Sequence, residues 1–131
     1  MPESPVRELR LAYTVEDYDG AVRFYRDALG LAVMQEWEQP AGSGAILDAG
    51  RATLELLSVS QSELVDRIEV GEVVSGPVRL ALEVEDSEET ASSLASAGAQ
   101  KIGGPVVTPW AHKNVRLRAP DGKQLTLFTV L

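Results

Sequence analysis

Cysteine and histidine, two residue types with frequent roles in catalysis, are scarce in this 131-residue sequence. It has no cysteine, which excludes disulfides, thiol nucleophiles and thiolate metal sites. Its single histidine, His112, is a candidate acid–base group because its reference pKa lies near neutrality. A lone histidine in a loop is more often a surface residue, and it cannot complete a usual zinc site alone.

The charge balance limits the partners of the protein. The sequence has 12 Lys and Arg against 20 Asp and Glu, for a net charge of −8. An acidic surface repels nucleic acids and anionic membranes, so neither is expected as a partner. A neutral or cationic small molecule fits better, although acidity also favours solubility. Residues 1–5 do not resemble a signal peptide and no apolar run is long enough to span a membrane, so we expect a cytoplasmic protein.

An internal repeat is the most informative pattern. Residues 9–17 (LRLAYTVED) and residues 78–86 (VRLALEVED) are identical at six of nine positions. In both segments apolar residues alternate with others, and a period of two is typical of a half-buried strand. The polar faces carry Arg10 in the first segment and Arg79 in the second, while Tyr13 falls on the apolar face and is expected in the core.

A helix is predicted directly after each of these strands. Asp17 and Asp86 are N-cap candidates, and apolar residues follow both at helical spacing. Gly30 and Gly98 then mark the helix ends. Each half therefore begins as a strand, a capped helix and a glycine.

Three further strands are predicted in each half. Alternation and turn residues place them at 32–37, 45–49 and 53–58, and at 101–102, 114–118 and 124–130. Between the halves, Ser60 is expected to cap a short helix over 62–68, and 70–77 form a linker. The order is βαβββ, twice, so the sequence predicts an α+β fold.

Two motifs resemble those of the vicinal oxygen chelate superfamily, which includes glyoxalase I, bleomycin-resistance proteins and extradiol dioxygenases. The segments VED at 15–17, AV at 21–22 and FYRDALGL at 24–31 resemble its V-x-D … A-x-x-F-Y-x-D-x-L-G signature. APDGK at 119–123 resembles its D-P-D-G-N turn, with Ala119 in place of the usual Asp. These motifs consist of caps, core aromatics and turns, so they specify a fold rather than a chemistry.

The resemblance implies one domain over residues 1–131. Two βαβββ modules, at about 6–59 and 78–131 with a linker at 60–77, would form a U-shaped mixed sheet. The helices would lie on its outer face and the ligand in its cleft.

Metal-dependent members place one ligand near the start of each module's first strand and one in each last strand. By motif, the resemblance puts these positions at Arg10, Glu55, Arg79 and Thr126. A guanidinium has no lone pair to donate, a threonine hydroxyl is a weak ligand, and two guanidinium groups repel a dication. Only Glu55 suits a divalent metal, so we expect neither a metal nor another cofactor.

The same positions predict a charge cluster of Arg10, Glu55 and Arg79, with Thr126 beside it. Two interpretations stay open. The cluster either binds a carboxylate or phosphate of a ligand, or it is a structural ion pair that fills a vestigial site.

Two tryptophans and the histidine are candidates for the apolar part of the site. Trp37 precedes a loop at 40–44, and Trp110 lies in a Pro-Trp-Ala-His segment that ends at His112. Both loops resemble segments that line the cleft of antibiotic-binding relatives, where indoles stack on flat ligands. The alternative is that these rings pack in the core or at a dimer interface.

Three functions are compatible with this pattern. The first is sequestration of a small organic molecule without a metal, as in bleomycin-resistance proteins. The second is an enzyme of the same superfamily, a lyase, isomerase, epimerase or dioxygenase acting on a small carbonyl or carboxylate compound, with Glu55 as base. The third is an accessory subunit. The resemblance also implies a homodimer in which Arg10 and Glu55 of one chain meet Arg79 and Thr126 of the other.

Overall fold

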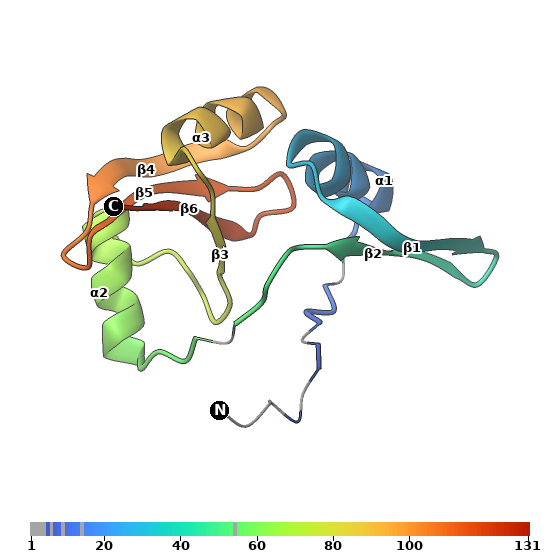
Figure 1. Cartoon of the computed structure of the whole chain (residues 1–131), viewed down its shortest axis with the longest axis horizontal. Coiled ribbons are helices and arrows are strands. Elements are labelled where there is room, and N and C mark those ends of the chain that lie inside the picture. Colours follow the sequence, from blue (N-terminus) through green and yellow to red (C-terminus); the bar gives the residue numbers. More distant parts are fainter. Residues whose placement is uncertain (1–4, 6, 9, 14, 54) are drawn as a thin grey trace.

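The computed structural model describes residues 5, 7–8, 10–13, 15–53 and 55–131 (Figure 1). The predicted α+β class is confirmed, because helices and strands both contribute to the fold. The elements are α1 (Tyr18–Val22), η1 (Arg23–Ala28), β1 (Ala32–Gln39), β2 (Gly42–Asp48), α2 (Val59–Glu69), β3 (Leu80–Glu83), α3 (Ser87–Ser96), β4 (Gln100–Val107), β5 (His112–Arg118) and β6 (Gln124–Val130).

The second half of the chain forms a four-stranded sheet with one covering helix. Its strand order is β3-β6-β5-β4, with β3 parallel to β6 and the other pairs antiparallel. The element order is βαβββ, as predicted for this half, although β3 is shorter than the predicted segment at 78–86. Asp86 caps α3 as predicted, since its Oδ1 accepts hydrogen bonds of 3.1 Å from the backbone N–H groups of Glu88 and Glu89.

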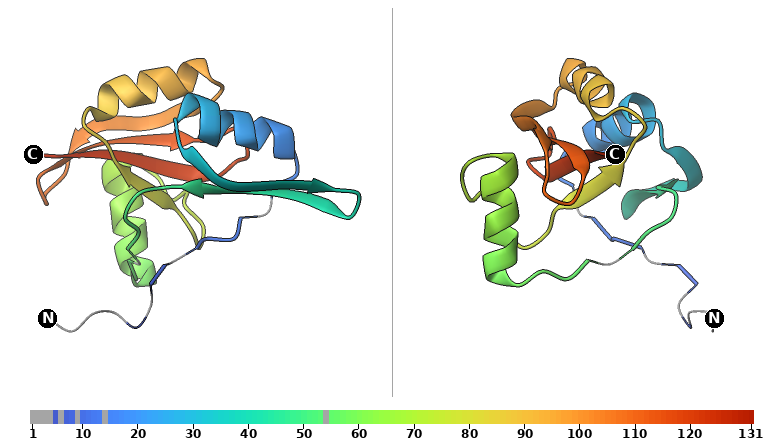
Figure 2. Two further views of the ribbon diagram at one scale, coloured as in Figure 1. Left: turned by 45° about the vertical axis from the view of Figure 1, so that its right-hand side comes forward. Right: turned by 60° about the vertical axis from the view of Figure 1, so that its left-hand side comes forward.

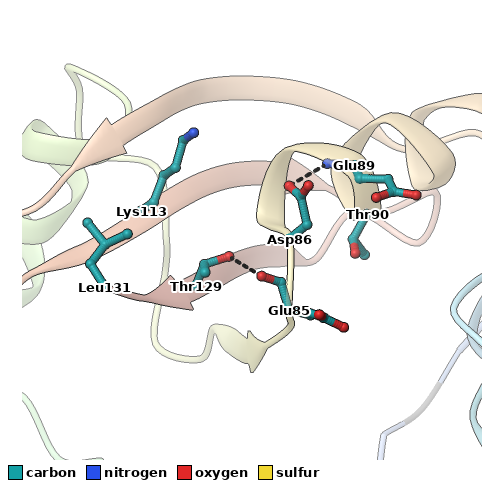
Figure 3. Close-up of a pocket in the computed structure, with 7 residues that line it drawn as sticks. All are labelled: Glu85, Asp86, Glu89, Thr90, Lys113, Thr129 and Leu131. Carbon is teal, nitrogen blue, oxygen red and sulfur yellow. Dashed lines mark hydrogen bonds between the residues drawn. The ribbon is translucent and has the colours of Figure 1, made fainter.

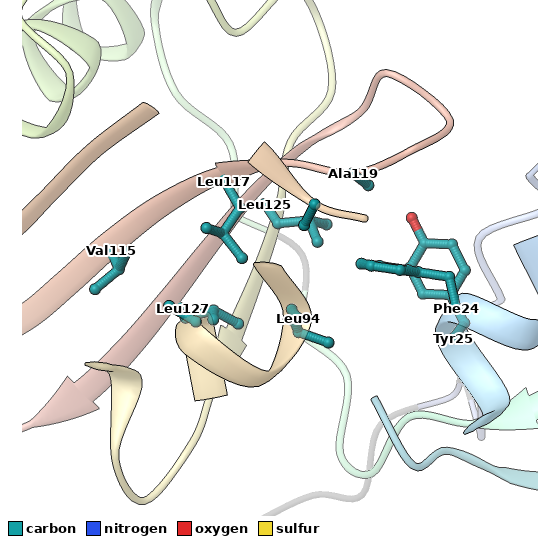
Figure 4. Packing of buried hydrophobic residues seen from close by; sticks show 10 residues of the cluster. Phe24, Tyr25, Leu94, Val115, Leu117, Ala119, Leu125 and Leu127 are labelled. Atoms are coloured by element: carbon teal, nitrogen blue, oxygen red, sulfur yellow. The ribbon is translucent and has the colours of Figure 1, made fainter. Parts of the chain in front are cut away.

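The hydrophobic core lies between this sheet and the helices of both halves (Figure 4). Alternation along β5 and β6 points Leu117, Leu125 and Leu127 toward Leu94 of α3, and all four side chains are fully buried. Burial of each leucine stabilises the fold by about 1.5–3 kcal/mol. Phe24 of η1 extends the same core, so the first helix packs against the second module.

The carboxylate of Asp121, in the β5–β6 turn, forms hydrogen bonds that hold the first helix in place. Tyr25 donates from its hydroxyl to Asp121 Oδ2 at 2.8 Å, and Tyr13 donates to Oδ1 of the same residue at 2.6 Å. Burial, together with the hydrogen bond to Asp121, raises the pKa of both phenols above its ordinary value. Tyr13 also packs against the core, as predicted from its place on the apolar face. The two sequence motifs therefore meet in space.

In the first half, η1 continues α1 as a π-helix, and the predicted cap is confirmed because Asp17 Oδ1 accepts a 3.0 Å hydrogen bond from Gly20 N. The strands β1 and β2 pair as an antiparallel hairpin that extends away from the four-stranded sheet (Figure 2). Every residue of β1 is exposed.

The strands predicted at 9–15 and 53–58 are not formed by the described residues of those segments, which are irregular. Leu9, Thr14 and Leu54 lie outside the described residues. A strand requires a hydrogen-bonded neighbour, and the parallel pairing that joins β3 to β6 has no counterpart in the first half among the described residues. The U-shaped arrangement of two complete modules is therefore not confirmed.

Two predictions near the β4–β5 hairpin are corrected. The strand expected at 101–102 continues to Val107, because irregularities in its register on both sides of Gly103 let this edge strand pass through Pro105. His112 is the first residue of β5 and not part of a loop.

The linker helix α2 is longer than the predicted 62–68. Its N-cap is Ser58 rather than Ser60, since Ser58 Oγ accepts a hydrogen bond of 3.2 Å from Gln61 N. None of the described helices is long and apolar enough to cross a membrane.

Candidate ligand-binding face

The four-stranded sheet has a second face, opposite α3, on which α2 lies (Figure 1). We call it the α2 face. Alternation along β5 and β6 places Asn114, Arg116 and Thr126 on it, because their neighbours in sequence point into the core. In contrast to the apolar core face, this face is strongly polar.

Arg116 is the centre of the α2 face and is fully buried. Its Nη1 donates to Asp66 Oδ1 at 2.9 Å and its Nη2 to Glu69 Oε1 at 2.7 Å. Its Nε also donates to Thr126 Oγ1 at 3.1 Å. A charge buried this deeply is tolerated only when it is paired and hydrogen-bonded, and here two carboxylates from α2 pair with it.

The same carboxylates hold α2 against the sheet. Glu69 accepts hydrogen bonds from Asn114 Nδ2 at 2.9 Å and from Thr126 Oγ1 at 3.1 Å. The backbone of α2 also lies directly on β4, since a Cβ at Gly103 would be 2.1 Å from the carbonyl oxygen of Glu69. The helix therefore closes the part of the α2 face that lies over β4 and β5.

The carboxyl of Asp66 in this network has a clearly shifted pKa. Burial raises the pKa of its carboxyl, but donors from Ser75, Val74 N and Arg116 outweigh that effect. The pKa of Asp66 falls to about 2 as a result. The carboxylate is thus held ionised opposite Arg116.

Arg79 lies beside this network at the start of β3. Its Nη1 donates to Thr126 Oγ1 at 3.0 Å. Burial and the charge of Arg116 lower the pKa of Arg79, while Glu69, Asp66 and Glu55 act in the opposite direction. The guanidinium stays protonated, because arginine does not lose its proton in proteins.

The predicted charge cluster is only partly assembled within one chain. The structure brings Arg79 and Thr126 together, and the charge of Glu55 acts on Arg79 although the Glu55 side chain is exposed. Arg10 is exposed and pairs with Glu8. Since that pair is exposed, it contributes little to stability.

The remainder of the α2 face carries an aromatic pair that is half-buried. The rings of His112 and Phe128 are stacked, with centroids 4.9 Å apart and an interplanar angle of 13°. Glu83 of β3 is the register partner of Phe128, so this acidic residue is next to the pair on the neighbouring strand. Trp110, in the turn before β5, is 40% exposed.

Trp37 belongs to the projecting hairpin and not to the α2 face. Its ring covers Gly44 of β2, because a Cβ there would be 2.2 Å from Trp37 Cζ2. The structure therefore does not bring Trp37 and Trp110 together within the chain.

A metal does not suit the residues at these positions. Arg79 and Thr126 occupy the two second-module positions that the motif assigns to metal ligands, and Arg116 adds a further positive charge beside them. Guanidinium groups donate no lone pair and repel a dication. Among the described residues, no three His, Cys, Asp or Glu side chains are grouped so that they could hold a metal ion.

A wide hollow of about 730 Å³ lies at the start of α3 (Figure 3). The polar groups that line this hollow make contacts that stabilise the fold. Asp86 caps the helix, Thr129 Oγ1 donates to the Glu85 carbonyl, and Lys113 pairs with Glu88. This hollow is therefore a weaker candidate than the α2 face.

Comparison with known proteins agrees with the motifs. Residues 9–127 match the family described as the Glyoxalase/Bleomycin resistance protein/Dioxygenase superfamily. The chain belongs to this superfamily. It is similar to the uncharacterized protein YraH of Bacillus subtilis (strain 168), with 26% identity over 127 residues that make up 94% of this chain and 98% of YraH.

Solved structures share the fold. One is TnmS3, described as an antibiotic binding protein from Streptomyces sp. CB03234, with 20% identity, a TM-score of 0.66, and coverage of 98% of this chain and 100% of TnmS3. Another is a glyoxalase/bleomycin resistance protein from the same organism, with 23% identity, a TM-score of 0.54, and coverage of 86% and 91%.

The site residues predicted from the sequence did not include Arg116, its partners Asp66 and Glu69, or Asn114 and Phe128. The spacing of Asp66 and Glu69, three residues apart on a helix, places both on one helical face, and this was the available signal. Phe128 shares a strand face with Thr126, so alternation from that residue would have placed it.

Proposed function

We propose that the protein binds and sequesters a small organic molecule on the α2 face, without a metal. One observation carries this proposal. Arg79 and Thr126 contact each other where a metal-dependent member would have metal ligands, and the half-buried aromatic pair of His112 and Phe128 lies next to them. A guanidinium binds carboxylates and phosphates, and stacked rings bind flat groups. The similarity to TnmS3, described as antibiotic binding, supports the same assignment.

Catalysis by Glu55 has less support. Its side chain is exposed, and no hydrogen bond to another described residue orients it. A general base needs a fixed position relative to the proton that it removes. The geometry of a single chain therefore favours binding over turnover.

We further propose that the protein acts as a homodimer in which a second copy covers the open faces. The exposed β1–β2 hairpin and the unpaired segments of the first half support this assignment. In such a dimer the predicted Arg10 and Glu55 of one chain would approach Arg79 and Thr126 of the other.

The binding proposal is tested with a panel of flat aromatic compounds, some neutral and some carrying a carboxylate or phosphate. We expect compounds that bind to raise the melting temperature and to quench Trp110 fluorescence, measured in a Trp37→Phe background. Arg79→Met should abolish binding of the anionic compounds, whereas Arg51→Met, a change at an exposed turn residue, should not.

Two outcomes would contradict this proposal. No stabilisation by any compound in the panel would argue against a binding function and in favour of an accessory subunit. Tight, stoichiometric binding of nickel, zinc, manganese or iron(II) to chelator-treated protein would contradict the metal-free site.

A further inference from the structure

A strip of alternate residues runs along the edge strand β3 on the α2 face. It consists of Arg79, Ala81 and Glu83, and β3 is the outermost strand of its sheet. Residues four apart in a strand are separated by about 13 Å, at about 3.3 Å per residue. This distance joins the Cα atoms of Arg79 and Glu83. The Arg79 guanidinium reaches Thr126, the register partner of Ala81, so the two charged groups are closer together than their Cα atoms.

The two end charges of this strip lack ion-pair partners among the described residues. The ion pairs of the described chain use Arg116, Asp66 and Glu69 on this face, and neither Arg79 nor Glu83 takes part in one. Among the described residues, the hydrogen-bond partner of the Arg79 side chain is the neutral hydroxyl of Thr126. Arg116 pairs with both carboxylates of α2, so Arg79 and Glu83 are the charged side chains of the strip that form no ion pair among the described residues and can pair with a ligand.

The surroundings of the strip differ at its two ends. Next to Ala81 lies Thr126, whose hydroxyl is already engaged by Glu69 and both arginines. Next to Glu83 lies Phe128, with His112 stacked on its ring. An aromatic face beside a carboxylate suits a planar group with a protonated nitrogen, through stacking and cation–π attraction.

We infer that the ligand of this face is a dipolar molecule, with a carboxylate or phosphate bound by Arg79 and a protonated nitrogen on a planar group bound by Glu83 and Phe128. The inference rests on the proposed binding function and specifies its ligand class. It also explains how a protein with an acidic net charge can use an arginine in its binding site, because each end of the ligand is next to a charge of opposite sign.

The test uses three rigid probes of one shape. They are 4′-(aminomethyl)biphenyl-4-carboxylate with both charges, biphenyl-4-carboxylate with the anion only, and 4-(aminomethyl)biphenyl with the cation only. Titration calorimetry should show that the dipolar probe binds about tenfold or more tightly than either other probe, a difference of about 1.4 kcal/mol. Glu83→Gln should remove the advantage of the dipolar probe over the anion-only probe and leave binding of the latter unchanged.

Matched variants complete the design. Arg79→Gln should remove the advantage of the dipolar probe over the cation-only probe, with circular dichroism melts to show that the variant is folded. Glu85→Gln makes the same charge change as Glu83→Gln at an exposed residue by the α3 hollow, and should leave all three affinities unchanged. Because Glu83 is itself exposed, its variant is expected to fold even if that of Arg79 does not.

The outcomes separate the two proposals. If the dipolar probe keeps its advantage in Glu83→Gln, or if flat compounds bind with no dependence on charge, the inference is overturned and the binding function stands. If neither the probes nor the aromatic panel bind, the binding function fails and the inference falls with it.

Discussion

At the scale of single residues, Arg116 explains why α2 lies where it does. A guanidinium with no exposed surface requires carboxylates, and Asp66 and Glu69 supply them from one helix. Burying two charges costs desolvation that their attraction offsets only with good geometry. The network therefore fixes the position of the helix more than it adds to total stability, and Arg79 lies beside it without an ion pair of its own among the described residues.

The lowered pKa of Asp66 makes a prediction about acid stability. Its pKa is about 2 in the folded protein against an ordinary 3.8, so the ionised form favours folding. This stabilisation, roughly 2 kcal/mol, is fully present above pH 4 and is lost as the pH falls from about 4 toward 2. Urea unfolding of the wild type and Asp66→Asn should show a large difference at pH 7 that shrinks over this window. The exposed Glu16→Gln serves as control, and a wild-type–Asp66→Asn difference that stays constant down to pH 2.5 would contradict this assignment.

At the scale of elements, local pattern predicted some strands and not others. The bounds of β6 follow from alternation after the Pro-Asp-Gly turn, and those of β4 do not, because Gly103 and Pro105 indicate a loop. The register irregularities that accommodate them depend on pairing with β5. In the first half, alternation at 9–15 indicated a strand, but alternation cannot supply the neighbour that a strand requires.

The part of the candidate site that could be predicted from the sequence is the part that the family motifs fix. The second-module positions Arg79 and Thr126 came from the family pattern, and the structure joins them. The carboxylates that neutralise Arg116 come from a linker helix, 47 residues earlier in the case of Glu69. No rule of sequence spacing relates segments so far apart, so only the structure shows that they are in contact.

The contact between α2 and β4 makes a prediction about Gly103. A methyl group there would be 2.1 Å from the Glu69 carbonyl oxygen and 3.0 Å from Val70 Cα, so the helix backbone must move. We expect Gly103→Ala to cost about 1–3 kcal/mol of unfolding free energy and to expose α2 to proteolysis. Gly42→Ala is the matched control, because nothing lies within 4 Å of a Cβ at Gly42 and alanine is no worse than glycine in a strand. Equal stability of the two variants would show that α2 is not packed on β4 as described.

At the scale of the whole molecule, the two halves differ in how well they are covered. The second module buries four leucines completely, whereas β1 is exposed along its entire length. Leu56, in the segment that leads into α2, and Val59, the first residue of α2, are 83% and 78% exposed. Apolar side chains and unpaired strand edges in one region are typical of an interaction surface.

The proposed homodimer predicts the mass of the protein in solution. Sedimentation equilibrium at micromolar concentration should give twice the 14.1 kDa of one chain, because a second copy would cover the β1–β2 hairpin. Met34→Asp places a charge on that hairpin, where the side chain is 59% exposed, and should shift the equilibrium toward monomer without loss of the helical circular dichroism signal. Ser92→Asp makes the same charge change on the exposed side of α3 and should leave the dimer intact. A wild type that stays monomeric over the whole concentration range would mean that the hairpin functions uncovered, and that one chain alone provides the ligand-binding face.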